Sequence, residues 1–152
     1  TKRSALAYTD MPYGTFSFLY HDAESLVFIA GGIGITPFIS MLRYIYDRRL
    51  EKRVMLIWSN KTEKDIVFRD ELEKMASDMP CFKVVHVMSR QDEWPGEKGR
   101  IDAEKLEKHV GSFHIGQFFI CGPPPMMRAM KRTLSDLGVP KGRIHTERFA
   151  LR

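Results

Sequence analysis

The chain has 152 residues, 43% hydrophobic and 28% charged, with a formal net charge of +5 at pH 7. This length and composition are typical of one globular domain with a full core. No apolar run reaches the ~20 residues of a membrane-spanning helix, and the amino terminus does not resemble a signal peptide. Basic and acidic residues are interleaved, for example across 71–74 and 104–108, which indicates solvated helix faces. We therefore expect no nucleic-acid binding and no membrane contact by this chain.

The cysteines and histidines show no spacing typical of a metal site. Cys81 and Cys121 are far apart and form no CxxC pair, and the five histidines do not cluster. We expect two free thiols in a reducing compartment, hence a location in the cytoplasm or at the cytoplasmic face of a membrane protein, and no bound metal.

Residues 1–20 differ from the remainder of the chain. Segments 5–8 and 15–19 could each form a strand, with a turn at 11–14 between them. Two strands bury little surface alone, so we expect them to belong to a preceding structure or to pack on an edge. Residues 21–25 would be a linker to a second region, 26–152.

A strand, a glycine turn and a helix start follow in direct succession. Residues 26–30 form an unbroken apolar run, typical of a buried parallel strand. The glycines of the turn are Gly31, Gly32 and Gly34. Thr36 could cap the next helix, and Pro37 suits its first turn. The free N–H groups of such a turn favour phosphate or nucleotide binding. The alternative is a tight turn without a ligand, because Pro37 replaces the third glycine of G-x-G-x-x-G and no acidic residue follows at the usual distance.

Strands and helices then alternate to the end of the chain. The expected helices are 36–49, 65–76, 101–110 and 124–137, and the expected further strands are 53–59, 82–88, 118–121 and 143–146. Residues 91–99 should form a surface loop or hairpin, and Phe68 should lie on the buried face of its helix. This alternation predicts a three-layer α/β fold, a five-stranded parallel sheet with helices on both faces. Its ligand should bind at the carboxyl ends of the strands.

Two of these strand ends carry distinctive residues. Ser59, Asn60 and Lys61 end the second strand, and Arg69 could reach over from the next helix. This neutral or basic set weakly favours a nucleotide with a 2′-phosphate, although Lys61 could equally be a solvated loop residue. Cys121 could be a nucleophile or a small buried filler, and no histidine follows it closely in sequence to activate it.

Four segments together resemble the C-terminal NAD(P)-binding domain of the ferredoxin–NADP reductase superfamily. They are 12–16, 31–37, 121–126 and 145–149. The resemblance implies that the glycine turn, with Gly31, Gly32, Gly34, Thr36 and Pro37, binds the pyrophosphate and the nicotinamide end. It implies that the adenosine end faces Ser59, Asn60 and Lys61, and that the nicotinamide lies beside Cys121, Gly122, Pro123 and Met126. Cys121 and Glu147 would be the catalytic pair, and Phe149 would pack near the flavin ring.

The resemblance also implies an enzyme, an NAD(P)H-dependent flavoprotein reductase. Hydride would pass from NADPH or NADH to FAD, and electrons would continue to a haem, iron or iron–sulfur acceptor. The partners would be the protein's own FAD-binding domain and a redox acceptor domain or protein. The flavin-binding Arg-x-Tyr/Phe-Ser/Thr motif has no counterpart in residues 1–11, so we expect the chain to bind NAD(P)H but not to turn over alone.

Two alternatives belong to other functional classes. One is a non-catalytic regulatory or docking module that retains the nucleotide-binding fold. The other is a phosphate-binding receiver-type protein, whose strand ends would need acidic residues instead of the Gly, Ser and Cys found here.

Overall fold

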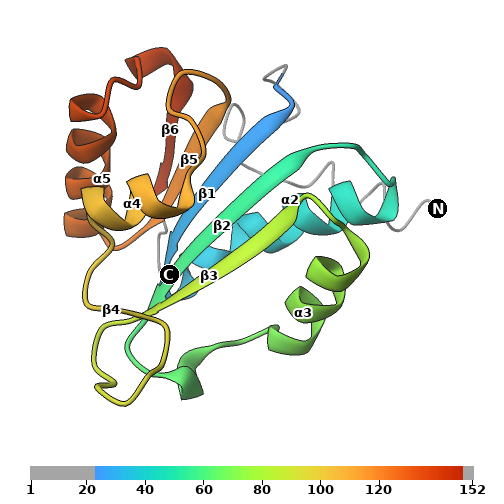
Figure 1. Cartoon of the computed structure of the whole chain (residues 1–152), viewed down its shortest axis with the longest axis horizontal. Helices are drawn as coiled ribbons and strands as arrows, with labels where there is room; N and C mark the ends of the chain where they lie inside the picture. Colours follow the sequence, from blue (N-terminus) through green and yellow to red (C-terminus); the bar gives the residue numbers. More distant parts are fainter. Residues whose placement is uncertain (1–22, 149–152) are drawn as a thin grey trace.

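The computed structural model of the chain describes residues 23–148. One parallel sheet runs through it in the order β4-β3-β2-β1-β5-β6 (Figure 1). Its strands are β1 (Ser25–Gly31), β2 (Arg53–Asn60), β3 (Phe82–Met88), β4 (Glu97–Lys98), β5 (Gln117–Gly122) and β6 (Ile144–Arg148). The α-helices are α2 (Thr36–Asp47), α3 (Arg69–Asp78), α4 (Ala103–His109) and α5 (Pro124–Asp136), and the short 3₁₀ helices are η3 (Gly32–Ile35), η4 (Glu63–Asp65) and η5 (Lys141–Arg143). The expected strands within 1–20 and Phe149 lie outside the described residues.

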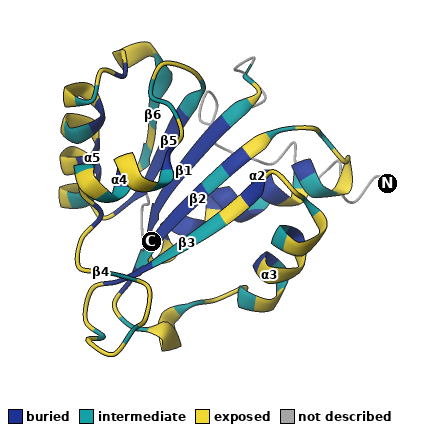
Figure 2. Cartoon of the chain, viewed as in Figure 1, coloured by how far each residue is buried: buried dark blue, intermediate teal, exposed yellow. Residues whose placement is uncertain are grey.

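Helices cover both faces of the sheet, which confirms the three-layer prediction. Alternate residues of β1 face opposite ways: Phe28 packs with α2 and α3, whereas Ile29 packs with α4 and α5. Both side chains are fully buried, because a central parallel strand is covered on each side. Figure 2 shows the central strands as the most buried part of the molecule and the outer helix faces as exposed.

The strand order contains one reversal, between β1 and β5. From β1 the chain moves outward through β2, β3 and β4, and then returns to place β5 on the other side of β1. The loops that leave β1 and β5 therefore diverge to opposite faces of the sheet. This divergence opens a crevice at their carboxyl ends, where ligands of such sheets bind.

The strand β4 was not predicted, and it makes the sheet six-stranded. Glu97 and Lys98 pair in parallel with Val87 and Met88, so the segment 91–99 is not a hairpin. Two charged residues carry no apolar periodicity, and the pairing is supported by the backbone bond from Gly99 N to Met88 O at 2.9 Å.

Four local predictions were wrong. The helix expected from residue 65 is split into η4 and α3, because Phe68 adopts a left-handed φ of +57°. Phe68 is 42% exposed and packs under the guanidinium of Arg43, which lies 5.5 Å from the centre of the Phe68 ring.

Thr36 does not cap α2: it is the first residue of that helix, and its hydroxyl donates to Ile33 O at 3.1 Å. Ser25, assigned to the linker, already belongs to β1.

The described residues contain no helix that is both long and apolar enough to cross a membrane.

Candidate functional site

The glycine turn sits directly on the end of β5. A Cβ atom placed on Gly34 would lie 2.2 Å from the carbonyl oxygen of Cys121, so only glycine fits at this contact. Gly32 has a positive φ of +55° and open space where a Cβ would be. The turn therefore approaches the neighbouring strand closely on one side and leaves its backbone accessible on the other.

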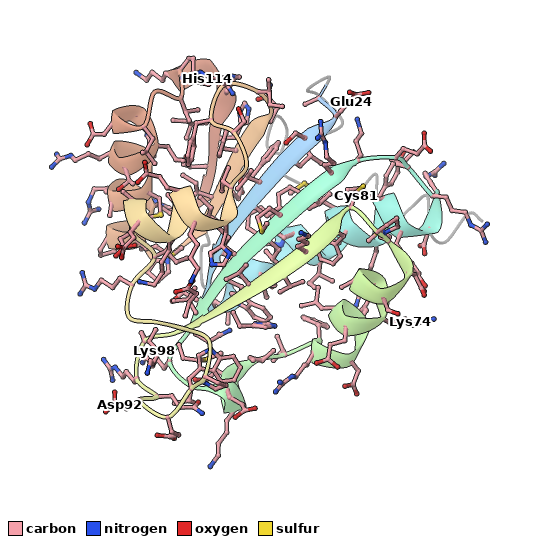
Figure 3. All side chains as sticks on the ribbon, viewed as in Figure 1. Glu24, Lys74, Cys81, Asp92, Lys98 and His114 are labelled. Carbon is pink, nitrogen blue, oxygen red and sulfur yellow. The ribbon has the colours of Figure 1, made fainter. Side chains whose placement is uncertain are left out.

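A cleft of ≈ 610 Å³ lies at the carboxyl ends of β1, β2, β3 and β5. The predicted site residues that line it are Gly31, Gly32, Ser59, Asn60, Lys61, Pro123 and Met126. In Figure 3, Lys98 lies near the end of the sheet that carries the cleft, whereas Glu24 and Cys81 lie near the opposite end, where β1 and β3 begin. The expected crevice between the glycine turn, the end of β2 and the start of α5 is thus present. Its size is that of a cofactor site.

Asn60 lines the cleft and carries a buried amide without a partner. The residue is only 5% exposed, and its Nδ2 has no hydrogen-bond partner among the described residues. Its backbone is held in place, because Asn60 O accepts from Ser89 N at 2.9 Å. A buried donor without a partner is costly, so a rotation of this side chain toward a ligand acceptor in the cleft would relieve that cost.

The lining of the cleft includes two cations and one carboxylate. Lys61 and Arg100 both line it, and within residues 23–148 neither makes an ion pair. The carboxylate is Asp65, whose Oδ2 accepts a hydrogen bond from Thr62 N at 3.1 Å and is therefore already bonded within the loop. Two free cations beside this bonded carboxylate favour an anionic ligand.

Cys121 and Glu147 lie side by side on neighbouring strands. They are register partners in β5 and β6, so both side chains face the same side of the sheet. Burial, followed by the negative charge of Glu147, raises the pKa of the Cys121 thiol to about 12. Burial also raises the pKa of Glu147. The thiol is therefore protonated at neutral pH and is not a thiolate nucleophile.

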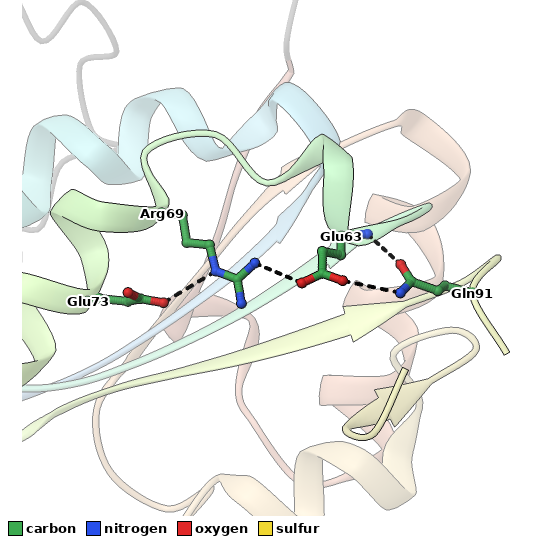
Figure 4. Close-up of polar contacts among 4 residues, drawn as sticks. All are labelled: Glu63, Arg69, Glu73 and Gln91. Atoms are coloured by element: carbon green, nitrogen blue, oxygen red, sulfur yellow. Dashed lines mark hydrogen bonds and ion pairs between the residues drawn. The ribbon is translucent and has the colours of Figure 1, made fainter. Parts of the chain in front are cut away.

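Arg69 is bound within the protein instead of facing the cleft. Its Nη1 donates to Glu63 at 3.0 Å and its Nε donates to Glu73 at 3.3 Å (Figure 4). Glu63 N in turn donates to the side-chain oxygen of Gln91 at 2.7 Å. The hydrogen bond from Arg69 and then that from Gln91 lower the pKa of Glu63. This network fastens the loop after β2 to the loop after β3.

Several predicted residues are not part of the cleft lining: Gly34, Thr36, Pro37, Arg69, Cys121, Gly122 and Glu147. The sequence interpretation in turn missed Ser89, Arg100 and Val67, which do line it. Ser89 directly follows β3, so the rule that selected Ser59 and Cys121 could have found it. Arg100 has no local signal, because it reaches the cleft only through the path of the segment 91–99.

Comparison with known proteins gives consistent matches. The family model of the oxidoreductase NAD-binding domain matches residues 28–132. The glycine betaine monooxygenase reductase subunit of Chromohalobacter salexigens is 33% identical over 142 residues, which cover 91% of this chain and 39% of that relative. NADH-cytochrome b5 reductase 1 of Meyerozyma guilliermondii is 39% identical over 136 residues, which cover 87% of this chain and 48% of the relative.

A solved structure has the same fold. The cytochrome b5 reductase domain of Ulva prolifera nitrate reductase superposes with a TM-score of 0.76 at 30% identity, over 83% of this chain and 49% of that chain. The present chain thus spans less than half the length of each of these three proteins.

Proposed function

This chain belongs to the oxidoreductase NAD-binding domain family, and we propose that it binds NAD(P)H in the cleft at the end of β1. In this proposal it presents the nicotinamide to an FAD held by another domain of the same protein. The observation that carries the proposal is that Gly32, Asn60 and Lys61 line one cleft and that the buried amide of Asn60 has no partner among the described residues. These groups fit the cofactor, since they offer backbone and amide donors and a free cation to a phosphorylated ligand.

The glycine turn would hold the pyrophosphate. Gly31 and Gly32 line the cleft and have no side chains to keep a ligand from the backbone N–H groups. Gly34, Thr36 and Pro37 would support this geometry, because they fix how the glycine turn joins β5 and α2. The exposed Thr36 hydroxyl could also turn toward a phosphate oxygen.

The adenosine end would lie against the end of β2. Ser59 and the Asn60 amide would bind the ribose, and Lys61 with Arg100 would attract a 2′-phosphate. This charge favours NADPH weakly over NADH. The name of the Meyerozyma guilliermondii relative specifies NADH, so the preference has to be measured.

The nicotinamide end would lie near the start of α5. Pro123 and Met126 supply an apolar wall. Gly122 leaves room for the glycine turn at the end of β1, since a Cβ on Gly122 would come within 3.1 Å of Gly31 N. When bound, the nicotinamide supplies the hydride that reduces the flavin. The protonated Cys121 thiol and Glu147 would determine the polarity and the charge of the environment near the nicotinamide.

The electron acceptors that would act after the flavin are proposed from the relatives alone. Those relatives are reductases and reductase subunits, which supports an electron acceptor containing haem, iron or an iron–sulfur centre. We expect the isolated chain to bind the nucleotide without sustained turnover, because it would lack its flavin. A non-catalytic docking module is the alternative, and it would have no need for Cys121 beside Glu147.

Calorimetric titration of the chain with NADPH and NADH tests this function. We expect binding of both, and tighter binding of NADPH by about fivefold, as an exposed ion pair worth about 1 kcal/mol would give. Lys61→Glu should abolish the preference. The control is Lys64→Glu, which makes the same charge change at a neighbouring residue outside the cleft lining. If neither nucleotide binds, and none binds after a flavin-binding domain is added, the proposal is refuted.

A further inference from the structure

The indole of Trp58 is bonded to the glycine turn from inside the core. Trp58 lies near the end of β2 and is fully buried. Its Nε1 donates to the carbonyl oxygen of Gly32 at 2.9 Å. The residue therefore joins β2 to the turn that leaves β1, although it does not itself line the cleft.

This bond fixes the orientation of one peptide unit. In a trans peptide the C=O and the following N–H point in opposite directions, and the described residues contain no cis peptide. Because the Gly32 carbonyl points into the core toward Trp58, the N–H of Ile33 points away from it. Ile33 is 56% exposed and lines the cleft, so this N–H is directed to the ligand side.

The alternative orientation would oppose anion binding. Gly32 has no Cβ and a φ of +55°, so no side chain at this position opposes a flip of the peptide. A flip would turn the carbonyl dipole toward the cleft, where it would repel a phosphate and leave the indole N–H without an acceptor. His86 packs beside the Trp58 ring, with ring centres 5.8 Å apart, and limits its movement.

We propose that Trp58 is a positioning residue, whose indole N–H holds the Gly32–Ile33 peptide with its N–H toward the pyrophosphate. This inference rests on the proposed nucleotide-binding function. It predicts that Trp58 matters for ligands that carry a pyrophosphate and much less for ligands that lack one.

The test compares two ligands and two tryptophan variants of the full chain. ADP-ribose carries the pyrophosphate without the nicotinamide, and adenosine lacks phosphate. Trp58→Phe should weaken ADP-ribose binding about five- to tenfold, the usual effect of one lost hydrogen bond, and should change adenosine binding less than about twofold. Trp94→Phe is the matched control, because the Trp94 Nε1 has no partner among the described residues.

The two tryptophans also allow a test in the native chain, should Trp58→Phe fold poorly. The sequence has only two tryptophans, so their indole N–H signals in ¹⁵N-resolved NMR spectra are easily assigned. ADP-ribose should shift the Trp58 signal in proportion to occupancy and leave the Trp94 signal in place, and adenosine should shift neither.

The outcomes separate the two proposals. If ADP-ribose binds but Trp58→Phe keeps the native affinity, or if the Trp58 signal stays fixed at saturation, the positioning role is overturned while nucleotide binding stands. Equal weakening of both ligands would show a merely structural role and also overturn it. If ADP-ribose does not bind the native chain, the proposed function fails and this inference fails with it.

Discussion

Replacing Gly34 by alanine should damage both the fold and the nucleotide site. The new Cβ would lie 2.2 Å from Cys121 O, 2.6 Å from Cys121 C and 2.9 Å from Gly122 N. These are backbone atoms of a central strand, so no side-chain rotation can relieve the contact. Overpacking typically costs 1–3 kcal/mol, and we expect about 3 kcal/mol here because three backbone atoms must move. For a chain of this size the melting temperature should fall by about 6–12 °C.

Thermal unfolding monitored by circular dichroism measures this effect, with Gly142→Ala as the control. Gly142 has open space around the position of a Cβ, so that variant should stay within about 0.5 kcal/mol of the native chain. NADH affinity should fall with Gly34→Ala and remain unchanged with Gly142→Ala. A melting temperature for Gly34→Ala within about 2 °C of the control would refute the close approach of the turn to β5.

Two further predictions concern titratable groups. Hydrogen bonds from His109 and then Lys108 lower the pKa of Glu97, so its contribution to stability is present above its unfolded pKa and is lost as pH falls through the folded value. The difference in urea unfolding free energy between the native chain and Glu97→Gln should therefore shrink from about pH 6.5 to about pH 3.5; a constant difference would contradict this. Because Cys121 is buried with a pKa of about 12 and Cys81 is exposed, iodoacetamide should modify only Cys81 in the folded chain, as peptide mass spectrometry would show; rapid labelling of Cys121 would contradict its burial.

Elements with strong apolar patterns could be predicted from the sequence. The continuous run of β1 and the periodic face of α5 indicated both the element type and its burial, because burial on a sheet or helix face imposes those patterns. Gly138 ends the α5 region with a φ of +95°, as its position after the helix predicted. The match of residues 28–132 confirms the family that the segments 12–16, 31–37, 121–126 and 145–149 resemble.

Features that depend on tertiary contacts could not be predicted. Glu97 and Lys98 form a strand only because the edge of β3 offers unpaired backbone groups. Phe68 has an apolar side chain at helical spacing, yet its left-handed backbone turns it outward to Arg43. Arg100 reaches the cleft by the path of a loop. In each case the deciding partner is distant in sequence.

The most direct test of the central claim is a map of backbone and side-chain amide shifts by NMR during titration with NADH. Nucleotide binding in the cleft predicts the largest changes at Gly31, Gly32 and the side-chain amide of Asn60. Glu24 and Cys81, at the opposite edge of the sheet, should be unaffected. Changes confined to that opposite edge, or a saturated complex in which the glycine turn and the Asn60 amide do not shift, would contradict the account.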